Sequence, residues 1–274
     1  NYLIRAERGI HMEKVMCDGT TICYAEQGKG EALILLHGYC GSSSYWDEVV
    51  PELARSYRCI VPDLRGHGKT DAPVGSYTIE QMGNDVLQLM DELNVEKAVL
   101  LGHSMGGYIA LSIAQRHPER LNAFGLIHST AYPDSEEAKE KRLRAVSTIQ
   151  TEGIVNFVDG LVPGLFAPEH VESLSTHVTR VKEIGYQTAP QGAVGAALAM
   201  RERPDRRDVL SATPLPVLLV AGEKDAVIPP ERTFTSDKPH IVKAVMPGAG
   251  HMSMYEAPEE LIQVIKQFMA GLSK

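Results

Sequence analysis

Six consecutive residues, Gly102-His103-Ser104-Met105-Gly106-Gly107, constrain the fold of this chain more than any other stretch. They follow the apolar run 98–101 and precede the helical pattern of 108–114, which predicts a strand, a tight turn and a helix. The spacing Gly-x-Ser-x-Gly in this setting is typical of a nucleophilic serine held at positive φ. Glycines two residues before and after the serine leave room where the strand and the helix nearly collide. The alternative is a glycine-rich turn with an incidental serine, so the partners of Ser104 must decide.

Length and charge limit the classes of protein to which the chain can belong. At 274 residues it is long enough to bury a core as one or two domains. A formal net charge of −8, from 27 basic and 35 acidic residues, argues against nucleic acid or a membrane as the main partner. No apolar run approaches the ~20 residues of a membrane span. The first residues lack the apolar segment of a signal peptide. We therefore expect a cytoplasmic protein, with Met12 as a candidate natural start behind a tag remnant, residues 1–11.

The four cysteines, Cys17, Cys23, Cys40 and Cys59, form neither a C-x-x-C pair nor a Cys/His metal spacing. We expect reduced thiols and predict no metal site and no cofactor. Cys40 lies in a loop that concerns the candidate site, and we interpret it as a small space-filling residue rather than a nucleophile.

Short apolar runs alternate with helical patterns along most of the chain, which predicts an α/β fold with a mostly parallel sheet. Strands are expected at 32–36, 58–62, 98–101, 121–127, 216–221 and 241–246. A hairpin is expected over 13–27, because Asp18-Gly19 is a hairpin turn signal. Helices are expected at 45–56, after the capping box that begins at Thr78, at 108–114 and at the end of the chain.

The segment from Tyr132 to Ala212 contains no convincing buried strand, and we interpret it as a helical insertion. The core then consists of residues 12–131 and 213–274. We expect the charged run 134–144 to be a solvated helix face. Apolar side chains of the insertion, together with His128, are predicted to line a substrate pocket, although most of them fit core packing equally well; they are Phe157, Leu161, Leu165, Phe166, Val194 and Leu198.

A nucleophilic serine needs a base, usually a histidine oriented by a carboxylate. His251 lies in a glycine-rich loop after the last expected strand and is the predicted base, and His128, at the end of a strand, is the main alternative. His103 is expected to turn away from the serine hydroxyl. The others are interpreted as structural or as surface residues; they are His37 and His67 in glycine-flanked loops, and His11, His117, His170, His177 and His240 at the surface.

The carboxylate is expected in a loop at the carboxyl end of another strand, where α/β sheets build their sites. Asp225 follows the strand 216–221, with Glu223 as the alternative, whereas Asp63 is expected to be structural. An oxyanion that forms at an attacked carbonyl needs N–H donors already in place. We expect these from the backbone amides of Tyr39 and Met105.

These stretches resemble the α/β-hydrolase fold family over residues 12–274. The matching motifs occur in family order; they are His37-Gly38, 63–68, 102–107, 222–225 and Gly250-His251. The resemblance implies an eight-stranded sheet with a helical cap over the site, here 132–212. A serine at position 104, where haloalkane dehalogenases and epoxide hydrolases carry aspartate, argues against those chemistries. Met105 stands where cofactor-free haloperoxidases tend to carry tryptophan, which argues against that branch.

Residues 199–210 and the strand after them are similar to the 3-oxoadipate enol-lactonase branch of the family. We therefore predict a serine carboxylesterase that cleaves carboxylic esters of small to medium acyl groups. Ser104, His251 and Asp225 act as its triad, through an acyl-enzyme. The partner is a small-molecule ester or lactone. A lactonase or carbon–carbon bond hydrolase with the same triad and a small-molecule sensor on this fold are the alternatives.

Overall fold

The computed structural model describes residues 12–17 and 19–272. The proposed tag remnant with His11, and Asp18 of the expected hairpin turn, lie outside the described residues. The strands belong to one sheet; they are β1 (Met12–Cys17), β2 (Thr20–Gln27), β3 (Ala32–Leu36), β4 (Arg58–Pro62), β5 (Ala98–His103), β6 (Leu121–Ile127), β7 (Val217–Gly222) and β8 (Ile241–Met246). Each matches an expected strand or a strand of the expected hairpin.

Helices connect these strands. The core helices and 3₁₀ turns are η1 (Ser43–Trp46), α2 (Val50–Leu53), α3 (Ile79–Glu92), α4 (Met105–Arg116), η2 (Pro118–Arg120), α11 (Pro230–Thr233), α12 (Ser253–Glu256) and α13 (Pro258–Leu272). Those between β6 and β7 are α5 (Glu136–Glu152), α6 (Ile154–Leu161), η3 (Val162–Leu165), α7 (His170–Ser173), α8 (Ser175–Tyr186), α9 (Pro190–Glu202) and α10 (Arg207–Ala212).

The sheet has the strand order β1-β2-β4-β3-β5-β6-β7-β8. Only β2 runs against its neighbours, since it pairs antiparallel with both β1 and β4 while the pairs from β4 to β8 are parallel. The carboxyl ends of β3, β5, β6, β7 and β8 therefore meet at the same edge. The predicted α/β fold with an eight-stranded, mostly parallel sheet is confirmed.

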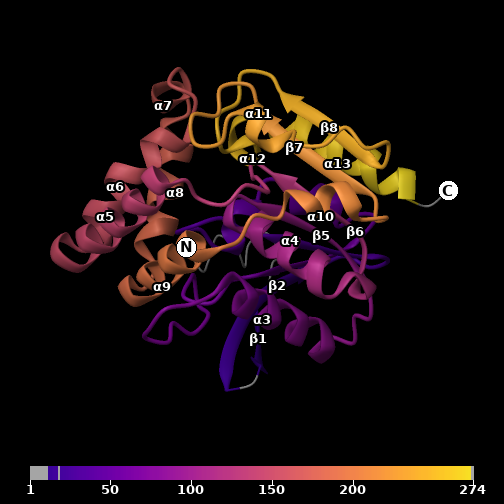
Figure 1. Ribbon diagram of the computed structural model, residues 1–274, viewed down its shortest axis with the longest axis horizontal. Coiled ribbons are helices and arrows are strands. Elements are labelled where there is room, and N and C mark those ends of the chain that lie inside the picture. Colours follow the sequence, from indigo (N-terminus) through magenta and orange to yellow (C-terminus); the bar gives the residue numbers. More distant parts are fainter. Residues whose placement is uncertain (1–11, 18, 273–274) are drawn as a thin grey trace.

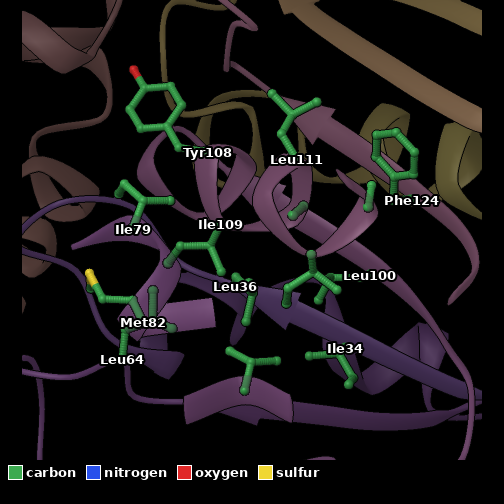
Figure 2. Close-up of a cluster of buried hydrophobic side chains, with 14 of the residues drawn as sticks. Ile34, Leu36, Leu64, Ile79, Met82, Leu100, Tyr108, Ile109, Leu111 and Phe124 are labelled. Atoms are coloured by element: carbon green, nitrogen blue, oxygen red, sulfur yellow. The ribbon is translucent and has the colours of Figure 1, made fainter. Parts of the chain in front are cut away.

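Two apolar clusters cover the two faces of the sheet, because successive strand residues point to opposite sides. Ile34 and Leu100 pack on the face covered by α3 and α4, as Figure 2 shows. Their neighbours Leu35 and Leu101 pack with η1, α2 and α13 on the other face. Strands buried on both sides need continuous apolar runs, which explains why β3 and β5 contain so few polar residues.

The local signals for two helices had different outcomes. Thr78 caps α3 as expected, since its hydroxyl oxygen accepts a hydrogen bond from the Gln81 backbone N–H at 2.9 Å. The single helix expected over 45–56 was wrong, because this stretch forms the 3₁₀ turn η1 and the short helix α2. Pro51, in the first turn of α2, has no N–H to continue a helix from the preceding residues.

Residues 132–212, called the insertion below, contain helices and no strand. Figure 1 shows α5, α6 and α8 grouped beside the sheet rather than over its broad faces. The expectation of a fully solvated charged run was partly wrong. Asp134 is buried, and its carboxylate pairs with Arg142 at 3.0 Å and with Arg203 at 2.6 Å. Among the described residues, no helix has the length and apolar character needed to span a membrane.

Candidate active site

Ser104 lies between the end of β5 and the start of α4, with φ 50° and ψ −111°. It is the one residue of 101–110 that is not buried. The two glycines of the motif make this turn feasible. A Cβ at Gly102 would lie 2.1 Å from the carbonyl carbon of Gly106, and a Cβ at Gly106 would lie 2.8 Å from the carbonyl oxygen of His37. The turn thus has the positive φ expected for an exposed nucleophile.

Asp225 and His251 lie in the loops after β7 and β8, at the same sheet edge as Ser104. His251 Nδ1 is 2.8 Å from Asp225 Oδ2, and both side chains are buried. The other carboxylate oxygen, Oδ1, accepts hydrogen bonds from the Val227 and Ile228 backbone N–H groups at 2.9 and 3.0 Å. Burial alone would raise the pKa of Asp225, but His251 and His128 hold it well below its ordinary value. The alternative acid, Glu223, is exposed.

His103 contacts the main chain of His251 rather than the serine hydroxyl. Its Nε2–H donates to the His251 carbonyl oxygen at 2.8 Å, and the two rings lie 4.9 Å apart. Burial keeps the pKa of His103 well below its ordinary value, so the ring is neutral at pH 7. His103 therefore links the chain beside Ser104 to the loop of His251.

His128 does not lie where it was expected. Its side chain has no exposed surface, so it lines no cavity that admits water in this conformation. Nδ1 lies 3.3 Å from Asp225 Oδ2, and Nε2 lies 2.7 Å from Ser253 Oγ. The residue thus sits behind the Asp225–His251 pair, next to the carboxylate.

The loop that begins at His37 lies directly beside Ser104. A Cβ at Gly38 would be 3.3 Å from the serine Cβ. Among the hydrogen bonds of the described residues, none uses the backbone N–H of Tyr39 or of Met105. The Met105 N–H begins α4 and has no acceptor within its own helix. Both expected oxyanion donors are therefore available.

Three buried polar side chains fasten this loop to the loop after β4. His37 Nε2 accepts the Leu64 N–H at 2.9 Å, and His67 Nε2 accepts the Cys40 N–H at 3.1 Å. Asp63 Oδ1 accepts a further backbone N–H of the loop at 2.7 Å. The three act through the backbone, as expected for structural residues.

Cys40 has the character of a packing residue. It is fully buried, and burial raises the pKa of its thiol to about 12. All four cysteines are free thiols, as expected. A thiol this hard to ionise is a poor nucleophile.

Part of the insertion packs directly over the loop that carries Tyr39. The Tyr39 hydroxyl donates to the Ala193 carbonyl oxygen at 2.8 Å, and its ring centroid lies 6.0 Å from that of Phe157. Leu161 and Val194, also predicted pocket residues, are half-buried in the same small cluster. The remaining predicted pocket residues are placed differently. Leu165 and Phe166 are buried in the apolar cluster on the sheet face covered by η1, α2 and α13, and Leu198 is half-buried on α9.

Glu256, which was not among the predicted site residues, has a fully buried carboxylate. Oε2 accepts the N–H groups of Gly250 and Met252, which flank the candidate base, at 3.0 and 2.9 Å. Oε1 accepts the Ala167 N–H of the insertion at 2.7 Å and lies 2.8 Å from His170 Nδ1. His170, expected at the surface, is thus half-buried. An acidic residue within the apolar stretch 252–257 was the available signal.

One group of side chains within the described residues has the composition of a metal site. Ligand atoms of His128, Asp225 and His251 lie within 4.8 Å of one another. Direct ligation by Asp or His needs about 2.0–2.2 Å from each atom to the ion. The 2.8 Å between His251 Nδ1 and Asp225 Oδ2 is the length of an ordinary N–H···O hydrogen bond. We interpret the group as a hydrogen-bonded site.

A family model described as alpha/beta hydrolase fold matches residues 31–258. The chain is 30% identical over 266 residues to the dihydrolipoyllysine-residue acetyltransferase component of the acetoin cleaving system of Cupriavidus necator. That match covers 93% of this chain and 68% of the relative, and the Pseudomonas putida counterpart is covered over 64%. The chain thus spans about two thirds of their length.

Two further similarities cover both partners nearly completely. The chain is 28% identical to 3-oxoadipate enol-lactonase 2 of Acinetobacter baylyi, over 90% of this chain and 92% of that protein. The structure of a thermophilic esterase from Thermogutta terrifontis is similar with a TM-score of 0.91 and 32% identity, over 96% of this chain and all of that one. The chain belongs to the alpha/beta hydrolase fold family.

Proposed function

We propose that the protein is a serine hydrolase that cleaves carboxylic esters of small to medium acyl groups. The observation that carries the proposal is the 2.8 Å contact between His251 Nδ1 and Asp225 Oδ2, at the sheet edge where Ser104 stands in its strained turn. A serine, a carboxylate and a histidine that follow one another in this order along the chain are the components of an acyl-transfer triad.

In the proposed reaction, Ser104 Oγ attacks the ester carbonyl carbon while His251 Nε2 takes the hydroxyl proton. The carbonyl oxygen becomes an oxyanion, and the N–H groups of Tyr39 and Met105 donate to it. His251 then gives the proton to the departing alcohol, which leaves an acyl group on the serine. Water attacks this acyl group with His251 again as the base, and the carboxylic acid and the free serine are restored. Asp225 orients the imidazole throughout.

We propose that the insertion acts as a cap and that Phe157, Leu161 and Val194 line the acyl side of the pocket. Their support is the small cluster in which they lie half-buried around the Tyr39 loop. The buried Leu165 and Phe166 are assigned to packing instead.

The experiment that tests the proposal measures hydrolysis of p-nitrophenyl esters from acetate to decanoate. We expect turnover by the wild type, an optimum at short to medium chains, and loss of turnover in Ser104→Ala. Ser147→Ala, at an exposed position on α5, is the matched control and keeps full activity. Full activity of Ser104→Ala would refute the proposal.

A lactonase is the second candidate, because an enol-lactonase of Acinetobacter baylyi is among the relatives. The same groups open a cyclic ester without releasing an alcohol, since the leaving oxygen stays on the acyl chain. Hydrolysis of five- and six-membered lactones, compared by kcat/KM with the best open-chain ester, separates the two. A wild type inactive on both series would favour carbon–carbon bond hydrolysis or a sensor role.

A further inference from the structure

A second histidine contacts the carboxylate of the proposed triad. His128 follows β6 with φ 50°, and its side chain is fully buried. Its Nδ1 lies 3.3 Å from Asp225 Oδ2, the same oxygen that lies 2.8 Å from His251 Nδ1. Its ring centroid is 5.6 Å from that of His251 and 5.9 Å from that of His103. His128 takes no part in the steps of the proposed reaction.

The hydrogen-bond partners of His128 determine which of its nitrogens carries the proton. The Ser253 backbone N–H points at Nε2 from 3.3 Å, and a backbone N–H only donates. Ser253 Oγ, at 2.7 Å, then donates to the same lone pair. The ring proton is therefore on Nδ1, which faces Asp225. The opposite tautomer would place a nitrogen lone pair against the carboxylate and an N–H against an N–H.

The charge of His128 follows from the groups that face it. These are Asp225 from the loop after β7, His251 from the loop after β8, His103 from the end of β5, and Glu256 from α12. Burial lowers the pKa of His128 even though Asp225 opposes the shift. A second proton would also have to displace the Ser253 donors from Nε2. The imidazole is thus neutral at pH 7, with its Nδ1–H on the side of the carboxylate.

We propose that His128 is a positioning residue for the proposed hydrolysis: its Nδ1–H holds Asp225 Oδ2 opposite His251 and withdraws part of the negative charge that His251 feels. This inference rests on the proposed function. Nδ1 and Oδ2 lie 3.3 Å apart but lack the alignment of a hydrogen bond, so the Nδ1–H acts on the carboxylate as a nearby dipole. Its effect is therefore smaller than that of Asp225 itself.

A positioning role and a packing role differ in their effect on the pH profile. Without the N–H, the Asp225 carboxylate attracts the protonated form of His251 more strongly. The acid limb of kcat/KM then moves to higher pH, whereas a packing defect changes stability and leaves the limb in place. A formed hydrogen bond to a charged group contributes roughly tenfold or more to an equilibrium or a rate, and we expect the low end of that range from this less well aligned contact.

The test compares His128→Leu, which removes both ring nitrogens, with His128→Asn, whose side-chain N–H takes the place of Nδ1–H. Asparagine also tolerates the positive φ at this position. We expect kcat to fall about tenfold in His128→Leu, with the acid limb raised by about 0.5 pH unit. We expect His128→Asn to keep most of the wild-type kcat, with the acid limb of kcat/KM at the wild-type pH. His117→Leu, at a partly exposed position far from the sheet edge of the site, is the control for the exchange itself.

Two outcomes overturn the inference while the proposed function stands: an unshifted limb in His128→Leu, or the same kinetics in both variants. A wild type without ester or lactone turnover refutes the proposed function instead. If His128→Leu does not fold, ¹⁵N-histidine NMR of the wild type decides. We expect His128 to be neutral with its proton on Nδ1 at pH 7, and a protonated Nε2 would overturn the inference.

Discussion

Replacement of Glu256 by glutamine tests whether one buried carboxylate fastens the His251 loop to the insertion. A glutamine has one acceptor oxygen where the glutamate has two. The backbone N–H groups of Gly250 and Met252 can only donate hydrogen bonds, so the glutamine amide oxygen must face them. The amide NH₂ then faces the insertion, where the His170 ring can present a lone pair but the Ala167 N–H cannot.

Glu256→Gln therefore leaves the buried Ala167 N–H without an acceptor and removes the negative charge of the carboxylate. An unsatisfied buried donor costs about 1–3 kcal/mol, so we expect the free energy of unfolding to fall by about 2 kcal/mol in Glu256→Gln. In Glu256→Ala all four donors lose their acceptor, and the fall is about 4 kcal/mol or more. Because the Gly250 and Met252 donors flank His251, we also expect kcat to fall in both variants, and to fall further in Glu256→Ala than in Glu256→Gln.

Urea unfolding measures these differences as shifts of the midpoint at constant slope. Glu259→Gln, an exposed glutamate at the start of α13, is the matched control and is expected to behave as the wild type. The reasoning is refuted if Glu256→Gln unfolds within about 0.5 kcal/mol of that control, or if the alanine and glutamine variants are equally stable.

Three further changes test other parts of the site. Asp225→Asn is expected to lower kcat by ~10³-fold or more because the imidazole loses its orienting charge; retention of a tenth of the activity would contradict the assigned role. Gly102→Ala puts a Cβ 2.1 Å from backbone carbon and is expected to destabilise the fold by about 3 kcal/mol, whereas Gly160→Ala, with open space around it, is not; calorimetry distinguishes them. Burial lowers the pKa of His37 to about 4 and that of His67 to about 3. Below pH ~6.5 these two imidazoles therefore bind protons in the unfolded chain but stay neutral in the folded one. Stability should therefore fall from pH 7 to 5, by up to about 1.4 kcal/mol per pH unit for each ring, and an unchanged urea midpoint would argue against it.

Most of the strands and the parallel sheet could be predicted from the sequence, because the signals for them are local. The strands are short apolar runs of the length that a buried parallel sheet requires, and the turn at Ser104 is bounded by glycines that no other residue could replace. Asp225 and His251 follow predicted strands directly, so a shared sheet edge was enough to bring them together. The break within 45–56 has a local signal, because Pro51 in the first turn of α2 cannot donate a hydrogen bond to the preceding turn.

The misplaced side chains all depend on contacts between distant segments. His128 ends a strand, but whether its ring faces a cavity or the Asp225 carboxylate is decided by the loops after β7 and β8. Asp134 was expected in water because its neighbours are charged, yet its partner Arg203 comes from 69 residues further along the chain. The role of Glu256 likewise requires the insertion to be in place. Patterns of spacing carry no information about such pairs.

The main chain and the side chain of Tyr39 contact different parts of the molecule, so they can be changed independently. Its backbone N–H is a proposed oxyanion donor, and its hydroxyl is tied to the Ala193 carbonyl oxygen on α9. Removal of the side chain would therefore loosen the contact between this loop and α9 while the amide stays in place. Under the proposed function, natural variation or laboratory evolution of this side chain would change substrate selection and leave the proposed oxyanion donor unchanged.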